Sequence, residues 1–317
     1  MRQVYLTRLA YALGDTAESV AQAATGAYLI SPAGALCEAG FEQHHMCQPG
    51  TTAYTLARQA AENLETALAG VDAIIYACCI PQNANLGDAA QFRTSRDVKY
   101  LMDYPASHLQ ADLGLKRAIV IGLTQQACSG MFGAIRLARA LLLAEPEMQQ
   151  VLCLMADRFP EGAYYEHAYN LISDGATACL VSTETEGFRL LACHAITNGA
   201  MATATDEETV GAYFSYSHRL IQETLAKANL TLTDIAWIIP QNINRKAIQI
   251  MARLLRYDYE RFYAPTLVQI GHMISGDNIV NLKHLAESGR LQPGARVLLF
   301  LAGYGLNWQC MILEWRG

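Results

Sequence analysis

One cysteine of the chain, Cys128, stands where a short apolar run meets a long apolar segment. The run at 118–123 predicts a buried strand, and residues 129–144 carry apolar side chains on nearly every side, which predicts a buried helix. The unpaired N–H groups and partial positive charge of a helix N-terminus favour a thiolate. Cys128 is therefore a candidate nucleophile. Most free cysteines are small core residues, and this stretch alone leaves that alternative open.

Two glycine-containing loops near the C-terminus carry groups that complement a nucleophilic cysteine. The loop at 271–278 holds His272 and precedes a helix predicted at 279–286, and its glycines permit close backbone approach. The loop at 302–308 lies between the last two predicted strands and can aim backbone N–H groups at an oxyanion. A lone histidine is more often structural, and a glycine turn is usually only a turn. Together with the cysteine they make a stronger case for catalysis than any one of them.

The elements that must position these groups recur in the two halves of the chain. The matching segments are 80–85 (IPQNAN) with 239–244 (IPQNIN), 151–156 with 297–302, and 176–181 with 309–314. The first pair agrees at five of six positions. Helices are predicted at 52–69 and 245–255, and a strand at 71–79. Continuous apolar strands in a repeated order predict a duplicated α/β unit, with halves at 1–183 and 184–317.

The composition excludes several classes of protein. The chain has 317 residues, 52% hydrophobic and 16% charged, so it can bury a large core. Its net charge is −6 without a long basic run, which argues against nucleic acid and anionic membrane as partners. No apolar segment reaches the ~18 residues of a membrane span, and the N-terminus is too polar for a secretory signal. Nine scattered cysteines then indicate reduced thiols in the cytoplasm.

No metal site is predicted. The cysteines form no CxxC pair, and the one tempting cluster of ligands is His44, His45 and Cys47. This cluster lies before Pro49 and Gly50, so we interpret it as part of an exposed loop.

The motifs at Cys128 and at the C-terminal glycine loop resemble those of the β-ketoacyl-acyl-carrier-protein synthase III family, within the thiolase superfamily. The matching segments are 126–131 (QACSGM), 173–176 (SDGA, for Gly-Asp-Gly-Ala) and 303–308 (GYGLNW, for Gly-Gly-Gly-x-Thr-Trp). The resemblance covers most of the chain and is weakest in the first forty residues and at 87–112. It implies a thiolase-like α/β fold, in which duplicated α/β halves form a five-layered αβαβα arrangement.

This resemblance also implies roles for individual residues. Cys128 would be acylated, and the backbone N–H groups of Cys128 and Tyr304 would form the oxyanion hole. The residues expected to bind substrate are Met131, Phe132, Met273, Gly303 and Gly305. Family members are commonly homodimers that take acyl groups from coenzyme A or acyl-carrier-protein thioesters. We therefore expect an acyl thioester as substrate, and no metal or redox cofactor.

The chain departs from the family pattern at two positions. The family has Pro-His-Gln-Ala-Asn where this chain has Pro240-Gln241-Asn242-Ile243-Asn244, and Asn in a Gly-Asn-Thr-Ser motif where this chain has His272. The imidazole and the amide look exchanged. Gln241 could still donate its amide N–H to a thioester oxygen, but it cannot act as a base. His272 is then the only base of the group.

Three polar residues near these motifs have two interpretations each. Asp277 could orient His272 as the third member of a triad or cap the helix predicted at 279–286, and we favour the cap. Asn244 could line the site, as its family counterpart does, or begin the following helix. Asp174 is expected to shape a turn rather than touch substrate.

These observations predict an acyltransferase with a ping-pong mechanism. An acyl thioester would acylate Cys128, and a second substrate would take the acyl group with help from His272. The family norm favours a Claisen-type condensation with a carbon nucleophile, in fatty-acid-like or specialised metabolism. The exchanged residues keep a second hypothesis open, in which His272 deprotonates an alcohol, amine or thiol acceptor. A third is a silent partner subunit of an active homologue, against which the retained Cys128 and His272 argue.

Overall fold

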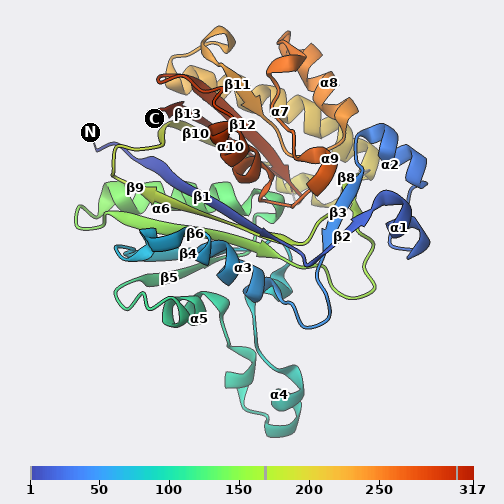
Figure 1. Cartoon of the computed structure of the whole chain (residues 1–317), viewed down its shortest axis with the longest axis vertical. Coiled ribbons are helices and arrows are strands. Elements are labelled where there is room, and N and C mark those ends of the chain that lie inside the picture. Colours follow the sequence, from blue (N-terminus) through green and yellow to red (C-terminus); the bar gives the residue numbers. More distant parts are fainter. Residues whose placement is uncertain (1, 168–169, 305) are drawn as a thin grey trace.

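In the described part of the chain, nine strands form one continuous sheet, which a short junction divides into two parts, named here the first and the second sheet (Figure 1). The computed structural model describes residues 2–167, 170–304 and 306–317. The first sheet has the order β1 (Tyr5–Leu13), β9 (Gly175–Ser182), β6 (Gln150–Asp157), β4 (Ala73–Ala77) and β5 (Ile119–Leu123). The second has the order β10 (Phe188–Thr197), β13 (Asn307–Trp315), β12 (Arg296–Gly303) and β11 (Trp237–Ile239). The two sheets meet where Tyr5 pairs with Arg189 and Leu6 with Phe188.

The strand pairings of the first sheet are repeated in the second. β1 and β9 are antiparallel, as are β10 and β13. β9 and β6 are antiparallel, as are β13 and β12. β6 and β4 are parallel, as are β12 and β11. A parallel bridge between Ile238 and Phe262 stands where the counterpart of β5 would lie. This repetition confirms the duplicated α/β fold.

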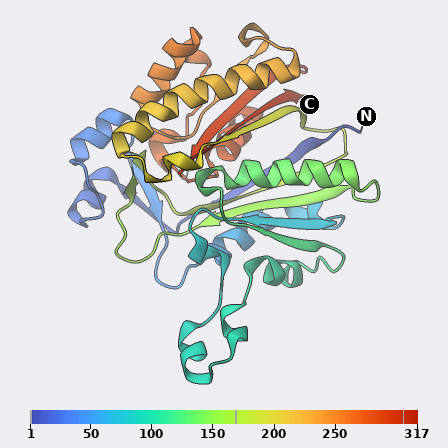
Figure 2. The same cartoon turned by 180° about the vertical axis from the view of Figure 1, so that it is seen from behind.

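Helices cover both sheets and fill the space between them (Figures 1 and 2). α3 (Ala53–Glu62) and α5 (Pro105–Asp112) share a hydrophobic cluster with the outer face of the first sheet. α6 (Gly130–Ala144) and α10 (Asp277–Glu287) contribute to the central cluster, which takes residues from both sheets. α7 (Asp206–Ala228) and α8 (Arg245–Leu255) pack against the far side of the second sheet. The order helix, sheet, helix, sheet, helix is the predicted five-layered arrangement.

Shorter elements lie at the edges of this frame. They are β2 (Thr16–Ser19), α1 (Val20–Thr25), α2 (Ala33–Ala39), β3 (Gln43–Met46), α4 (Ala89–Ser95), β7 (Glu166–His167), β8 (Asn170–Leu171) and α9 (Leu267–Ile270). α4 belongs to a segment that projects away from the body of the protein (Figure 1). The boundary between halves at 183 and 184 stays a prediction, which the end of β9 at Ser182 supports.

Several predicted elements differ from the structure. The helix predicted at 129–144 forms, but its burial is one-sided after the first turn, and Leu143 is 40% exposed. The helix predicted at 52–69 ends at Glu62, and a 3-10 turn covers 65–68. His44 does not lie in an exposed loop, because it is fully buried on β3 and its Nδ1 lies 2.8 Å from the Ile172 carbonyl oxygen.

β5 is an exposed edge strand, so the prediction of a buried strand is wrong for the single chain. Ile119 is 48% exposed and Val120 39%, because β5 has β4 as its only neighbour in the order of the described strands. The segment Ala127–Ala144 is 18 residues long with a mean hydropathy of 1.4, enough by length and composition to cross a membrane. Its place in the central layer between two sheets accounts for its apolar character.

Candidate active site

Cys128 lies in a tight turn at the entrance to α6. A 3-10 turn (Ala127–Ser129) leads directly into the helix, and the Ser129 N–H donates to the Gln126 carbonyl oxygen. Ser275 accepts a hydrogen bond from the Met131 N–H at 2.7 Å, and so satisfies one of the free donors at the start of α6. Because Ser275 belongs to the loop that carries His272, this bond ties the two candidate catalytic segments together.

His272 enters the site from a sharp turn that requires glycine. Gly271 has φ 71° and ψ −154°, a conformation that side chains exclude. A β-carbon at Gly271 would lie 2.7 Å from the Leu171 carbonyl oxygen. The His272 N–H donates to that oxygen at 2.7 Å. The turn therefore holds His272 against β8, and its side chain is 7% exposed.

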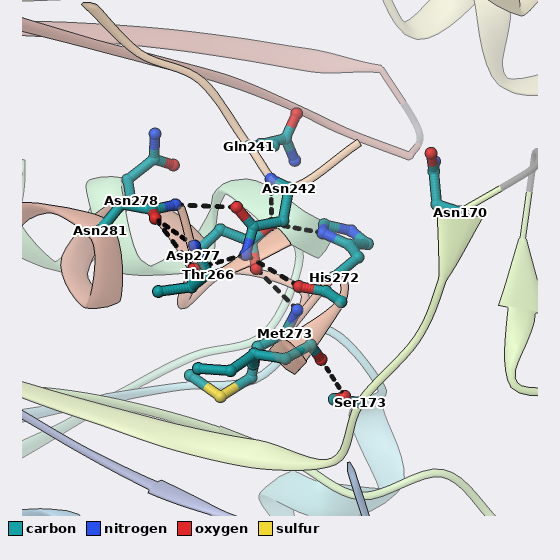
Figure 3. A network of polar contacts seen from close by, with 12 residues as sticks. Asn170, Ser173, Gln241, Asn242, Thr266, His272, Met273, Asp277, Asn278 and Asn281 are labelled. Carbon is teal, nitrogen blue, oxygen red and sulfur yellow. Dashed lines mark hydrogen bonds and ion pairs between the residues drawn. The ribbon is translucent and has the colours of Figure 1, made fainter. Parts of the chain in front are cut away.

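Asp277 is the partner of His272, and the preferred interpretation as a helix cap is wrong. His272 Nδ1 lies 2.5 Å from Asp277 Oδ2, as Figure 3 shows. The carboxylate also accepts from the Asn242 N–H at 2.8 Å and the Met273 N–H at 2.6 Å. Asp277 is the first residue of α10, one position too late for a cap, and Gly276 before it has no capping side chain. Three donors fill the carboxylate and fix its direction.

Cys128 and His272 line the same cavity, and a contact between the sulfur and the imidazole contributes to the pKa shifts of both groups. Burial by itself lowers the pKa of His272, but the Asp277 carboxylate and the Cys128 sulfur outweigh it and raise that pKa to about 10. A hydrogen bond from Cys79, followed by His272, holds the pKa of Cys128 well below its usual range against the opposing effect of burial. The two shifts favour a thiolate paired with an imidazolium.

Cys79 is a site residue that the sequence analysis missed. Its free thiol is in hydrogen-bond contact with the Cys128 sulfur. Its backbone N–H donates to the buried Asp157 carboxylate at 2.8 Å. Burial raises the pKa of Asp157 to about 7, although hydrogen bonds from Ile80, Asn83 and Cys79 lower it. Cys79 follows β4, and β4 runs parallel to β5, which precedes Cys128. The carboxyl ends of parallel strands lie at one edge of a sheet. The predicted strands before Cys79 and Cys128 were therefore a signal in the sequence that the two cysteines lie close together.

Gln241 is held by backbone rather than free to meet a substrate. Its Nε2 donates to the Ala302 carbonyl oxygen at 2.9 Å, and its Oε1 accepts from the Ala302 N–H at 2.8 Å. The amide thus joins the end of β11 to β12 just before the glycine loop. These bonds oppose the predicted role of Gln241 as a donor to thioester oxygen, because only one N–H of the amide remains.

Asn244 caps α8. Its Oδ1 accepts from the Ala247 N–H at 2.9 Å, so of its two interpretations the structure favours the start of the helix. Its backbone N–H donates to Asn170 Oδ1 at 3.2 Å. Asn170 lines the cavity beside Cys128, and the sequence offered no signal for it.

A cavity of about 100 Å³ opens at Cys128 and His272. Its lining residues are Cys128, His167, Asn170, Thr209, Tyr213, Gln241, Ile243, His272, Ala302, Gly303, Tyr304, Leu306 and Trp308. Gly303 is required there, because a β-carbon would lie 3.2 Å from the Cys128 nitrogen and 2.5 Å from the Gln126 carbonyl oxygen. Tyr304 lines the opening, where its ring packs edge-on against His167. Its backbone role stays a prediction.

The residues predicted to form an apolar substrate pocket are in the core. Met131 and Phe132 are fully buried in the central cluster, and Met273 packs with Ile270 and Val280. None of the three lines the cavity at Cys128. The first turn of α6 directs Met131 and Phe132 between the sheets, and Met273 lies in the loop before α10. Gly305 lies outside the described residues. No group of three or more metal-ligating side chains occurs at 2–167, 170–304 or 306–317.

Comparison with known proteins adds the family. The model of 3-oxoacyl-acyl-carrier-protein synthase III matches residues 124–199, and that of its C-terminal part matches 225–315. The β-ketoacyl-acyl-carrier-protein synthase III of Nitratidesulfovibrio vulgaris is 26% identical over 307 residues, covering 87% of each chain. The protein of the same name from Wolbachia pipientis is 22% identical over 301 residues, covering 87% of this chain and 88% of that one.

Solved structures agree with the fold. The synthase III of Thermus thermophilus has a TM-score of 0.82 at 24% identity, covering 99% of each chain. ChlB3, described as an acyltransferase, has a TM-score of 0.83 at 20% identity and covers 99% of this chain and 98% of its own. Fold and site thus define a thiolase-fold acyltransferase. The two matched regions take in more than half of the sequence, and the chain belongs to the β-ketoacyl-acyl-carrier-protein synthase III family.

Proposed function

We propose that the protein transfers an acyl group from a coenzyme A or acyl-carrier-protein thioester through Cys128 to a carbon nucleophile, in a Claisen-type condensation. The observation that carries the proposal is that Cys128, at the start of α6, and His272 line one cavity, with His272 held by Asp277. The thiolate attacks the thioester carbonyl, and the C–S bond to the donor breaks. The departing thiolate takes the proton of the His272 imidazolium, which leaves acyl-Cys128 and a neutral imidazole.

The second half-reaction consumes the acyl group. For condensation, loss of carbon dioxide from a malonyl thioester supplies the carbon nucleophile, and hydrogen bonds to its carbonyl oxygen stabilise the enolate. The second N–H of Gln241 is the donor proposed for that oxygen. His272 can join it only after its site-facing ring nitrogen has taken up a new proton, because the first one left with the donor thiol. The backbone N–H groups of Cys128 and Tyr304 are proposed to hold the oxyanion of the acyl group, which the close packing of Gly303 against the Cys128 nitrogen supports.

Transfer to an alcohol, amine or thiol is the second candidate, and one observation favours it. After acylation, His272 is a neutral imidazole whose Nδ1 is oriented by Asp277, so the other ring nitrogen can accept a proton. The Gln241 amide makes two hydrogen bonds to the Ala302 backbone, which leaves one N–H to stabilise an enolate. This arrangement suits deprotonation of a heteroatom nucleophile. A silent partner subunit is less well supported, because the Cys128–His272 pair is intact.

One experiment separates the candidates. Cys128 is acylated with a short acyl-coenzyme A, carbon-labelled malonyl thioester is added, and carbon dioxide release is followed beside product mass. Release that matches a two-carbon-longer β-keto product, lost in Cys128→Ala and His272→Ala, is the result expected for condensation. An acyl-Cys128 that forms and stays idle with malonyl would contradict it and favour a heteroatom acceptor. Absence of any acyl-enzyme by intact mass would favour the silent subunit.

A carrier protein is proposed as one acyl donor, and α8 supports it. Its exposed face combines basic and apolar side chains, and it begins four residues after Gln241, which lines the cavity. The exposed residues are Arg245, Lys246, Ile250, Arg253 and Leu254 on the helix and Arg256 just after it. Such a face would complement an acidic carrier that delivers its thioester next to Cys128. A cytoplasmic location is proposed from the nine free cysteines.

A homodimer is proposed on the evidence of β5. An apolar edge strand with free backbone groups on one side is unstable against pairing in a soluble protein. A second copy of β5 would pair with it and cover Ile119 and Val120, which are exposed in the single chain.

A further inference from the structure

Three buried side chains form a closed ring of hydrogen bonds next to His272 and Asp277 (Figure 3). Asn242 Nδ2 donates to Thr266 Oγ1 at 2.9 Å, and Thr266 Oγ1 donates to Asn281 Oδ1 at 2.9 Å. Asn281 Nδ2 returns to Asn242 Oδ1 at 2.8 Å. Each side chain thus gives one bond and receives one. All three are at most 4% exposed, so a lost partner could not be replaced by bulk water.

The ring joins three separate segments. Asn242 follows β11, Thr266 precedes α9, and Asn281 lies in the middle of α10. None of the three touches the cavity at Cys128 within the described part of the chain. Their contacts are with one another and with the loop that carries the catalytic pair.

Asn242 connects the ring to the loop that carries His272 by two further hydrogen bonds. Its backbone N–H donates to Asp277 Oδ2 at 2.8 Å, the same oxygen that faces His272. The second N–H of its side chain donates to the Gly271 carbonyl oxygen at 2.8 Å, immediately before His272. Asn242 therefore holds both His272 and Asp277. It contacts Asp277 through the carboxylate and His272 through the preceding residue, Gly271.

We propose that Asn242, Thr266 and Asn281 are positioning residues, which hold Asp277 and His272 in place beside Cys128. The inference rests on the proposed function in taking Cys128 and His272 as the reacting pair. A displacement of the Asp277 carboxylate weakens its attraction for the imidazolium, and the thiolate then loses its cation. The ring contacts neither the substrate cavity nor the Cys128 sulfur, so its effect on Cys128 is transmitted by His272 and Asp277.

Thr266 offers a matched pair of substitutions. Thr266→Val replaces the hydroxyl by a methyl of similar size and leaves one donor of Asn242 and one acceptor of Asn281 short of a partner. Thr266→Ser keeps the hydroxyl and removes a methyl. Asn281→Ala breaks the same ring from α10 and serves as the second variant if Thr266→Val does not fold. The titratable groups near the pair or the cavity stay unchanged in all three variants: Cys79, Asp157, His167, Tyr213, Asp277 and Tyr304.

The test measures the rate at which iodoacetamide alkylates Cys128 in the intact protein, as a function of pH, by mass spectrometry of the Cys128 peptide. No acyl substrate is needed, so the result does not depend on which acceptor the enzyme uses. We expect the acid limb of the profile to move to higher pH by about one unit in Thr266→Val and Asn281→Ala, so that on this limb both variants react about tenfold more slowly than the wild type. Thr266→Ser should follow the wild-type profile.

Two results would overturn the inference. One is a wild-type pH profile in Thr266→Val or Asn281→Ala together with a lower unfolding temperature, which would make the ring structural only. The other is an equal loss in Thr266→Ser, which would trace the effect to packing of the methyl. A protein that alkylates as expected but transfers no acyl group would contradict the proposed function and leave the ring's role intact.

Discussion

Asp277 lies five residues after His272 and places its Oδ2 2.5 Å from the imidazole Nδ1, with both side chains buried. Asp277→Asn keeps the size and removes the charge, so the imidazolium loses the group that stabilises it most directly. We expect acylation of Cys128 to slow on the order of 10²–10³-fold. Stopped-flow release of coenzyme A measures this rate. A change below about threefold, in a variant that folds normally, would show that the carboxylate is not part of the catalytic group.

The pH dependence follows from the two shifted groups. The pKa of Cys128 is lowered and that of His272 is raised to about 10, which widens the pH range over which the thiolate and the imidazolium coexist. The alkylation rate of Cys128 should be level on both sides of about pH 8.5, the ordinary thiol value, and should fall in acid as the thiolate takes a proton. Acyl-enzyme formation should fall above about pH 10, where the imidazolium that protonates the leaving thiolate is lost. A rate that rises steadily through pH 8.5, the ordinary thiol value, would contradict the ion pair.

Cys79 contributes the hydrogen bond that lowers the pKa of Cys128 most. Cys79→Ala removes it, so the alkylation profile of Cys128 should move to higher pH, and Cys79→Ser should restore much of the shift. Cys78→Ala is the matched control, since Cys78 is its buried neighbour in sequence and does not bond to Cys128. Equal profiles for Cys79→Ala and Cys78→Ala would remove Cys79 from the site.

The sequence predicted the parts of the site that depend on local pattern. α8 has the predicted bounds, the duplicated strands lie in two equivalent sheets, and Cys128 and His272 meet as candidates from the two halves. These features follow from hydrophobic periodicity and from helix ends, which neighbouring residues determine. The prediction for Asp277 failed because a local capping rule competed with a tertiary contact that the sequence does not display.

Contacts between distant residues account for the other errors. Gln241 pairs with Ala302, 61 positions away, and the apolar run of β5 reflects an edge strand rather than a covered one. Met131 and Phe132 lie close to Cys128 in sequence, but the direction of α6 sends them into the core. Closeness to a motif therefore gave the candidate nucleophile and its histidine without giving the walls of the cavity.

Gln241 provides a test that separates a structural amide from a catalytic one. Gln241→Met keeps the length of the side chain and loses both bonds to Ala302, so we expect unfolding to become easier by about 1–3 kcal/mol. Urea denaturation measures this, with Gln249→Met on α8 as the control for the same chemical change. Unaltered stability with a large loss of product formation would mean that the amide acts on the substrate.

Val120 tests the proposed dimer. A lysine in place of Val120 puts a charge on the β5 edge, where pairing with a second copy would bury it, and desolvating that charge opposes association. We expect Val120→Lys to sediment as a monomer under conditions in which the wild type is a dimer. Ile250→Lys on α8 is the matched control, because Ile250 is 41% exposed and Val120 is 39% exposed. If both variants stay dimeric, the contact between copies lies elsewhere, and the apolar edge of β5 requires another cover. If the wild type is itself a monomer at micromolar concentration, the homodimer proposal fails.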